Sequence, residues 1–148
     1  MPLVARLFVK TGVVYLVLAF VLGAVLLVLE AIGRSAPYII GVQHSHMAFV
    51  GWLVNTVAGV ALWLLPLNRR AFPNNQGRYP PIAAGGAYLM LNIGLALRLV
   101  VEPLHVSAPT EATRVLLILA AVLQVAAIAV VGWIVWHRVY PPIRLRVD

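Results

Sequence analysis

Four long apolar runs divide this sequence, at residues 8–32, 44–66, 81–101 and 113–137. Each is at least as long as the roughly 20 residues that an α-helix needs to cross the hydrocarbon core of a bilayer. With 63% hydrophobic residues and a mean hydropathy of +0.99, the chain is too apolar for a water-soluble domain of its size. The sequence predicts an all-α membrane protein, a four-transmembrane-helix bundle forming a single domain over residues 1–148.

The first run is longer than the apolar segment of a signal peptide, and Glu30 and Arg34 follow it in place of a cleavage site of small residues. We therefore expect it to remain as a span. The chain contains no cysteine, which excludes disulfides, thiolate metal sites and covalent attachment of haem through a CxxCH motif. Any haem would be held without covalent bonds.

Lysine and arginine residues beside the runs predict the orientation, because such residues are retained in the cytoplasm. The side shared by the two termini and the loop between the second and third runs carries Arg6, Lys10, Arg69, Arg70, Arg78, Arg138, Arg144 and Arg146. The other side carries Arg34, Arg98 and Arg114. We expect both termini in the cytoplasm and a bacterial-type plasma (inner) membrane. The net charge of +7 then reflects topology and attraction to the lipid bilayer, so no nucleic-acid partner is expected.

This topology gathers most of the ionisable residues at the predicted outer ends of the runs. Three of the four histidines and three of the four carboxylates lie there: His44, His46, His105, Glu30, Glu102 and Glu111. Arg34, Arg98 and Arg114 lie at the same level. Ionisable side chains inside a membrane protein are costly and mark functional sites, so this end is the candidate site.

His44 and His46 point about 160° apart on a helix and cannot serve the same face. His44 shares its stripe with Ala48, Gly51, Asn55 and Gly59, which are small or polar and suit the close approach of a helix or a flat cofactor. His46 shares its stripe with aliphatic residues, which suit lipid or a neighbouring subunit. We expect His44 to face inward and His46 outward.

An inward histidine is the usual ligand for iron, with its second ring nitrogen fixed by an acceptor such as a carboxylate. Glu30 and Glu102 are the nearest candidates for that acceptor. The alternative for Glu102 is an ion pair with Arg98, four residues earlier on the same helix. The amides of Asn55, Asn92 and Gln124 fall near mid-membrane, where we expect them to hydrogen-bond between helices.

The stretch "HSHMAFVGWLVNTVAGVALWLLPLNRRAFP", residues 44–73, resembles the second transmembrane helix of the haem-copper oxidase catalytic subunit. That superfamily includes the cytochrome and quinol oxidases and the nitric oxide reductases. Its helix opens with an axial histidine ligand of the low-spin haem, which maps onto His44, and ends in a Gly-containing stretch, an aromatic residue and "LP" or "VP". Residues 88–103 are also similar to oxidase-like proteins. The chain as a whole looks like small stand-alone subunit I-like proteins with an HxHxxxxGW motif.

The resemblance implies non-covalent haem b with His44 as an axial ligand. We expect His105 as the second ligand, although Pro103 could end the helix and direct His105 elsewhere. Arg98 and Arg114, with Arg34 behind them, would neutralise the haem propionates. The chain lacks the later helices that carry the other haem and copper ligands of the family, so oxygen reduction to water and proton pumping are not expected. Electron transfer, or binding of nitric oxide or oxygen, would remain, with an unidentified redox partner.

Two alternatives stay open at this point. The chain could be a cofactor-free structural or assembly protein that kept oxidase-like helices. It could instead hold copper or zinc through His44, His46 and His105, although residues two apart on a helix diverge. Four spans enclose little volume, so we also expect a homo-oligomer, with His46 at the contact between subunits.

Overall fold

The structure, a computed structural model, describes residues 1–139, so Arg144 and Arg146 of the charge count lie outside it. The elements in chain order are α1 (Leu3–Ala31), α2 (Tyr38–His46), the π-helix η1 (Met47–Val54), α3 (Asn55–Leu64), the short 3₁₀ helix η2 (Pro73–Asn75), α4 (Pro81–Ser107) and α5 (Glu111–Arg138). The elements α2, η1 and α3 are continuous and form one span, Tyr38–Leu64. Four helices of 27 to 29 residues are thus long and apolar enough to cross a membrane, which confirms the predicted all-α, four-span membrane protein.

The helices extend further than the apolar runs. The second span begins at Tyr38, so His44 lies more than one turn inside it. The third span, α4, continues through Pro103 to Ser107. Pro103 therefore does not end the helix, and His105 belongs to its last turn.

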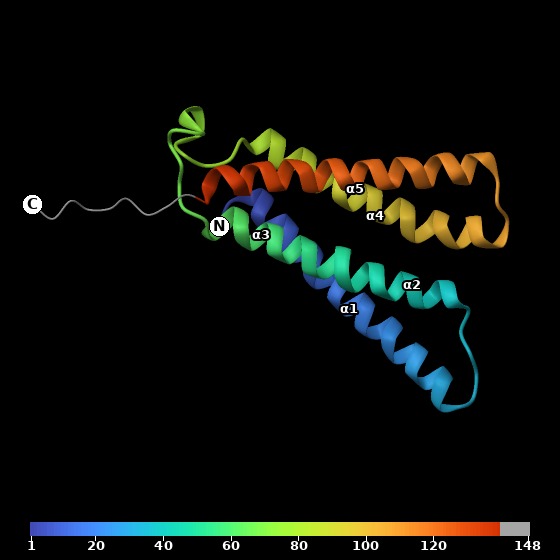
Figure 1. The fold of residues 1–148 in the computed structure, drawn as a ribbon. Coiled ribbons are helices and arrows are strands. Elements are labelled where there is room, and N and C mark those ends of the chain that lie inside the picture. The colour runs from blue at the N-terminus through green and yellow to red at the C-terminus, as the bar shows by residue number, and fades with distance from the viewer. Residues whose placement is uncertain (140–148) are drawn as a thin grey trace, which may run out of the picture.

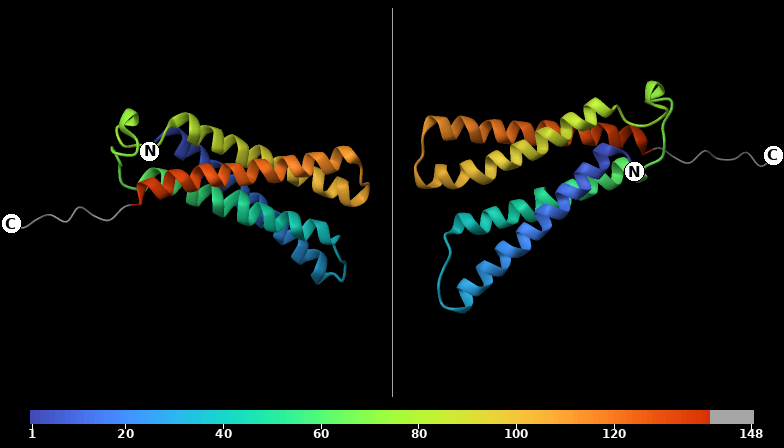
Figure 2. Two further views of the ribbon diagram at one scale, coloured as in Figure 1. Left: turned by 45° about the horizontal axis from the view of Figure 1, so that its top comes forward. Right: turned by 180° about the vertical axis from the view of Figure 1, so that it is seen from behind.

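The four spans form two antiparallel pairs, α1 with the second span and α4 with α5 (Figure 1). We call the end with residue 1, the loop 65–80 and the end of α5 the terminal end, and the end with the connections 32–37 and 108–110 the histidine end. The pairs lie together at the terminal end and diverge toward the histidine end (Figure 2). There the second span lies between α1 and α4, so two of its faces contact protein.

Glycines bring α1 and the second span into close contact. A Cβ atom on Gly59 would lie 2.8 Å from the Ala5 carbonyl oxygen, and one on Gly12 would clash with Thr56 Oγ1. A Cβ on Gly51 would meet the Tyr15 ring at 2.5 Å. Because lipid tails are as apolar as aliphatic side chains, helices in a membrane associate through such close packing.

The two pairs are held together by polar and aromatic contacts. Near the terminal end the hydroxyls of Thr11 and Tyr88 lie 2.8 Å apart, and the Phe8 ring packs edge-on against Tyr88 with centroids 5.2 Å apart. At the terminal end itself Arg138 is buried and donates to the Leu62, Leu65 and Pro66 carbonyls, where the second span ends. Leu62 lies in the last turn of α3, where carbonyls have no acceptor role within the helix, and Leu65 and Pro66 directly follow it, so Arg138 of α5 caps the end of α3.

The π-helical segment was not expected from the sequence. A π-helix has more residues per turn than an α-helix, so each residue rotates by less than 100° about the helix axis. The residues that follow η1 therefore lie on different faces from those of a regular α-helix. Thr56 therefore contacts Gly12 on α1, while Asn55 turns to α4 and accepts a 3.0 Å hydrogen bond from Asn92. The Asn55 amide donates to the Val50 and Gly51 carbonyls within η1, which satisfies acceptors at the change of helix type.

Replacing Gly59 by alanine should destabilise the protein by about 1–3 kcal/mol, because the new methyl group has to displace the α1 backbone at Ala5. Gly132→Ala is the matched control, since its Cβ would meet nothing within 4 Å and alanine favours the helix. Thermal unfolding in detergent, followed by circular dichroism, compares the two variants. Equal melting temperatures for both would contradict the proposed tight contact.

Candidate functional site

Glu102, on α4 at the histidine end, is the centre of a polar cluster. Its Oε2 atom accepts a 3.0 Å hydrogen bond from Gln43 Nε2 and lies 3.3 Å from His46 Nε2 and 3.5 Å from Arg98 Nε. Gln43 and His46 come from α2, whereas Arg98 precedes Glu102 by one turn on α4. The cluster therefore joins the two helix pairs at the level where they diverge.

His46 points to α4, so the prediction that it faces lipid or another subunit is wrong. The prediction assumed a bundle with one interior. In the structure the second span lies between α1 and α4, and two histidines on opposite sides of it each reach a different neighbour. The ion pair of Arg98 with Glu102, offered as the alternative role for these residues, is present.

His44 points to α1. Its Nδ1 atom lies 3.0 Å from the Ala19 carbonyl oxygen, and its Cε1 atom lies 2.9 Å from the position of a Cβ atom on Gly23. Because a carbonyl oxygen can only accept, Nδ1 carries the proton and the Nε2 lone pair is free. The acceptor for His44 is thus a backbone carbonyl and not the predicted carboxylate of Glu30 or Glu102.

The imidazole of His44 lines an apolar groove of about 490 Å³ between α1 and the second span. It is the only titratable residue in the lining, and the remaining residues are aliphatic or aromatic: Leu16, Ala19, Phe20, Gly23, Ala24, Leu27, Ala48 and Trp52. The volume of the groove lies within the range of small-molecule sites. Such sites typically combine an apolar lining with one well-placed polar group. The groove and the free Nε2 make His44 the strongest candidate ligand in the described chain.

His105 is held by α5. Its Nδ1 atom lies 2.7 Å from Thr113 Oγ1, and that oxygen also lies 2.9 Å from the Thr110 carbonyl. Both ring tautomers of His105 fit this contact, because the Thr113 hydroxyl can donate to Nδ1 or accept from it. Thr110 and Thr113 also form the capping box that begins α5, so the same hydroxyl positions a helix end and a histidine.

The predicted site residues thus lie at one end of the bundle but do not form one cluster. The rings of His44, His46 and His105 contact α1, α4 and α5 respectively. Within residues 1–139 no group of three or more histidine, cysteine, aspartate or glutamate side chains is arranged to hold a metal ion. The structure therefore does not assemble the three-histidine copper or zinc site.

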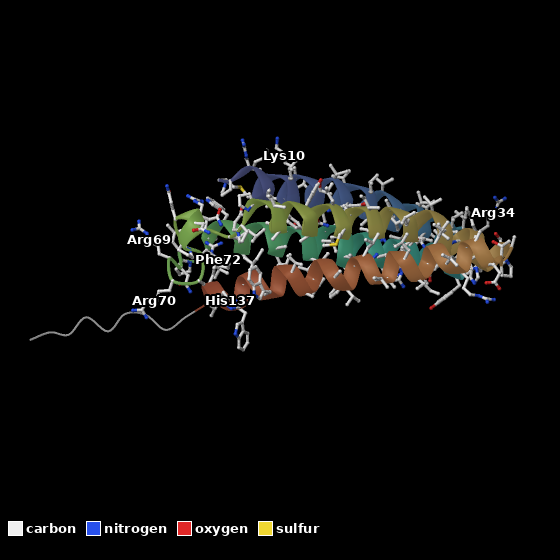
Figure 3. The ribbon with its side chains drawn as sticks, turned by 90° about the horizontal axis from the view of Figure 1, so that it is seen from above. Lys10, Arg34, Arg69, Arg70, Phe72 and His137 are labelled. Atoms are coloured by element: carbon white, nitrogen blue, oxygen red, sulfur yellow. The ribbon has the colours of Figure 1, made fainter. Side chains whose placement is uncertain are left out.

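The charged residues predicted to surround a cofactor do not line the groove beside His44. They pair with one another or line a different cavity. Arg98 pairs with Glu102, and Arg114 pairs with Glu111 at 2.8 Å within the exposed first turn of α5. Glu30 and Arg34 line a separate cavity of about 560 Å³ beside the 32–37 connection. Figure 3 shows Arg34 at the opposite end of the bundle from Arg69 and Arg70.

The predicted mid-membrane hydrogen bonds form in part. Asn92 donates to Asn55 across the two helix pairs, which confirms the predicted hydrogen bond between helices for these two amides. Asn92 Oδ1 and Gln124 Nε2 are buried without a hydrogen-bond partner among the described residues. Gln124 lies instead against Gly94, in the contact between α4 and α5.

Sequence reasoning missed Gln43, which is 5% exposed and donates to Glu102. Its signal was present, because Gln43 precedes His46 by three residues and shares its helix face. The Ala19 carbonyl could not have been found in this way, since a backbone acceptor depends on how two helices cross.

Comparison with protein-family models, curated proteins and solved structures finds no match for this chain. The resemblance of residues 44–73 to the oxidase helix stays a prediction from the sequence.

Substituting Glu102 by glutamine should lower the free energy of unfolding by about 1–2 kcal/mol, because the contacts with Arg98 and His46 lose their charge and the bond from Gln43 weakens. Glu111→Gln is the control, since its pair with Arg114 is exposed and should contribute less than about 1 kcal/mol. Chemical unfolding in detergent measures both. A smaller loss for Glu102→Gln than for Glu111→Gln would contradict the role of Glu102 in joining the pairs.

Proposed function

We propose that this protein binds a b-type haem through His44 and serves in electron transfer or in binding a small gas such as nitric oxide or oxygen. The observation that carries the proposal is the state of His44. Its Nδ1–H is directed to the Ala19 carbonyl, its Nε2 is free, and the ring lines an apolar groove. A histidine that holds iron has its other ring nitrogen fixed in this way.

The lining of the groove fits a flat, apolar cofactor. Ala19, Gly23, Ala24 and Ala48 are small, so they leave room beside the imidazole, and no charged side chain lines the groove. When bound, a b-type haem supplies a one-electron iron centre that also binds small gases. The chain itself would supply the ligand, fix its tautomer through Ala19 and exclude water.

His44 is the single ligand that we assign. His105 was the expected second ligand, but its ring is held by Thr113 on the other helix pair, away from the α1 face of the second span. An open sixth position favours gas binding over electron transfer. Arg34, Arg98 and Arg114 are not required in this proposal, because two of them already pair with carboxylates.

The proposed orientation keeps both termini in the cytoplasm of a bacterial-type cell, with the histidine end outside. Its support is the excess of Lys and Arg at the terminal end. A reporter enzyme fused after Asp148 should be active only in its cytoplasmic form. Activity of a periplasmic reporter at that position would reverse the orientation and place His44 near the cytoplasm.

Protein purified from haem-replete cells should show a Soret band, and His44→Ala should abolish it while leaving the helical content unchanged. Free imidazole added to His44→Ala should restore the band, because it replaces the missing ligand without repairing any packing. Gly23→Ala should also reduce haem retention, since its methyl group displaces the imidazole, whereas Gly41→Ala meets nothing within 4 Å and should not. Optical spectra and a pyridine haemochrome assay measure haem per chain.

His46→Ala should keep the Soret band, because His46 contacts Glu102 and not the groove. Carbon monoxide should bind the reduced wild-type protein rapidly and stoichiometrically if the sixth position is open. Slow binding that becomes fast in His105→Ala would instead show that His105 closes the site. A colourless wild-type protein would reject haem binding and support the cofactor-free structural alternative.

A further inference from the structure

The second span contains eight residues of π-helix, Met47–Val54, between His44 and Asn55. Segments of this kind are rare, and they occur frequently at functional sites. Two residues of the segment, Ala48 and Trp52, line the groove beside the imidazole of His44. The irregular part of the span is thus part of the candidate site.

The contacts of the second span with α1 show that η1 adds a residue to the helix. Gly51 packs on the ring of Tyr15, and Thr56 packs on Gly12, so both lie on the face toward α1. In an α-helix, residues five apart differ in direction by about 140°, so these two residues would lie on different faces. In a π-helix, residues five apart are joined by the backbone hydrogen bonds and lie on the same face.

The added residue determines where His44 points. Removing one residue from a helix rotates everything on its far side by about 100°. Since Gly59 holds α3 against α1, an α-helix in place of η1 would turn His44 away from α1 and bring Ser45 toward it. Ser45 is exposed in the structure. The imidazole would then lose both the Ala19 carbonyl and its place in the groove.

Asn55 is the side chain that holds η1 in its π-helical form. It is completely buried, and its Nδ2 atom donates to the Gly51 carbonyl at 2.9 Å and to the Val50 carbonyl at 3.2 Å. A change from α-helical to π-helical bonding leaves carbonyls without their usual donors, and a buried carbonyl without a donor is costly. Asn92 donates to Asn55 Oδ1 at 3.0 Å, so the Asn55 amide has its nitrogen toward η1.

We propose that Asn55 is a positioning residue for His44: its amide maintains the π-helical form of η1, and that form directs the imidazole to α1 and into the groove. Asn55 does not line the groove itself. The importance of His44 as a ligand rests on the proposed function. The direction of its ring is measured without haem, so the two proposals can fail separately.

The first measurement uses the full chain from haem-depleted cells, with isotope-labelled histidine, and nuclear magnetic resonance of the ring nitrogens. His44 should show a single Nδ1–H tautomer, because the Ala19 carbonyl can only accept. Asn55→Leu should abolish this preference. Asn92→Leu is the matched control, since it removes the same bond between the two amides but leaves both bonds from Asn55 to η1. It should keep the wild-type signal.

Cysteine cross-linking measures the direction of residue 44 independently, because the chain has no cysteine of its own. A chain with His44→Cys and Gly23→Cys should form a disulfide, since the imidazole packs on Gly23. Adding Asn55→Leu should slow disulfide formation about tenfold, as expected for the loss of two hydrogen bonds that favour η1. Adding Asn92→Leu should leave the rate unchanged.

Deleting Leu53, a partly exposed residue of η1, provides a rescue. The deletion removes the added residue, so a regular α-helix would again direct residue 44 to α1, and the cross-link should return in the Asn55→Leu chain. An Asn55→Leu chain that does not regain the cross-link after this deletion would overturn the proposal, whether or not Asn55→Leu folds alone. Equal effects of Asn55→Leu and Asn92→Leu, or no effect of Asn55→Leu, would also overturn it.

Discussion

The close contact between α1 and the second span determines most of what this chain can do. Glycines at several levels remove the side chains that would hold the two helices apart, and the face they free is the one that carries His44. The imidazole consequently meets a helix backbone, not solvent, and Ala19 fixes its tautomer. With one face of the second span committed to α1, only the other faces remain for α4. That division sends His46 to Glu102 and separates two histidines that are neighbours in the sequence.

The polar contacts between the two helix pairs follow from the hydrocarbon that surrounds a membrane-spanning helix. In hydrocarbon a polar side chain gains little by facing outward, so each polar residue of the spans is best satisfied by a partner on another helix. Thr11 with Tyr88, Asn55 with Asn92, and Gln43 and His46 with Glu102 occur at successive levels from the terminal end to the histidine end. The last of these three levels carries formal charges, on Glu102 and Arg98. It is also where the pairs diverge, so charged groups hold the part of the interface with the least packing.

The number of spans, their helical nature and the gathering of ionisable residues at one end were predictable, because each depends on composition, length and charge along the chain. The contact of Gly51 and Gly59 with α1 was predictable from their size. The face of His46 was not. It depends on whether the bundle has one interior or two helix pairs, and on a π-helical segment that changes the helical phase after His46. The burial of Arg138 was not predictable either, because its acceptors are backbone carbonyls at a helix end. Every residue has a backbone carbonyl, so the residue types do not show which carbonyl accepts.

The arginines at the two ends of the bundle have different kinds of partner. At the histidine end Arg98 and Arg114 each have a carboxylate, so the field there is largely balanced. At the terminal end Arg138 is satisfied by carbonyl groups, which share its hydrogen bonds but carry no net negative charge. Its charge therefore adds to that of Arg78 nearby instead of cancelling it. A helix bundle that caps a span with a buried arginine thus concentrates positive charge at that end of the span.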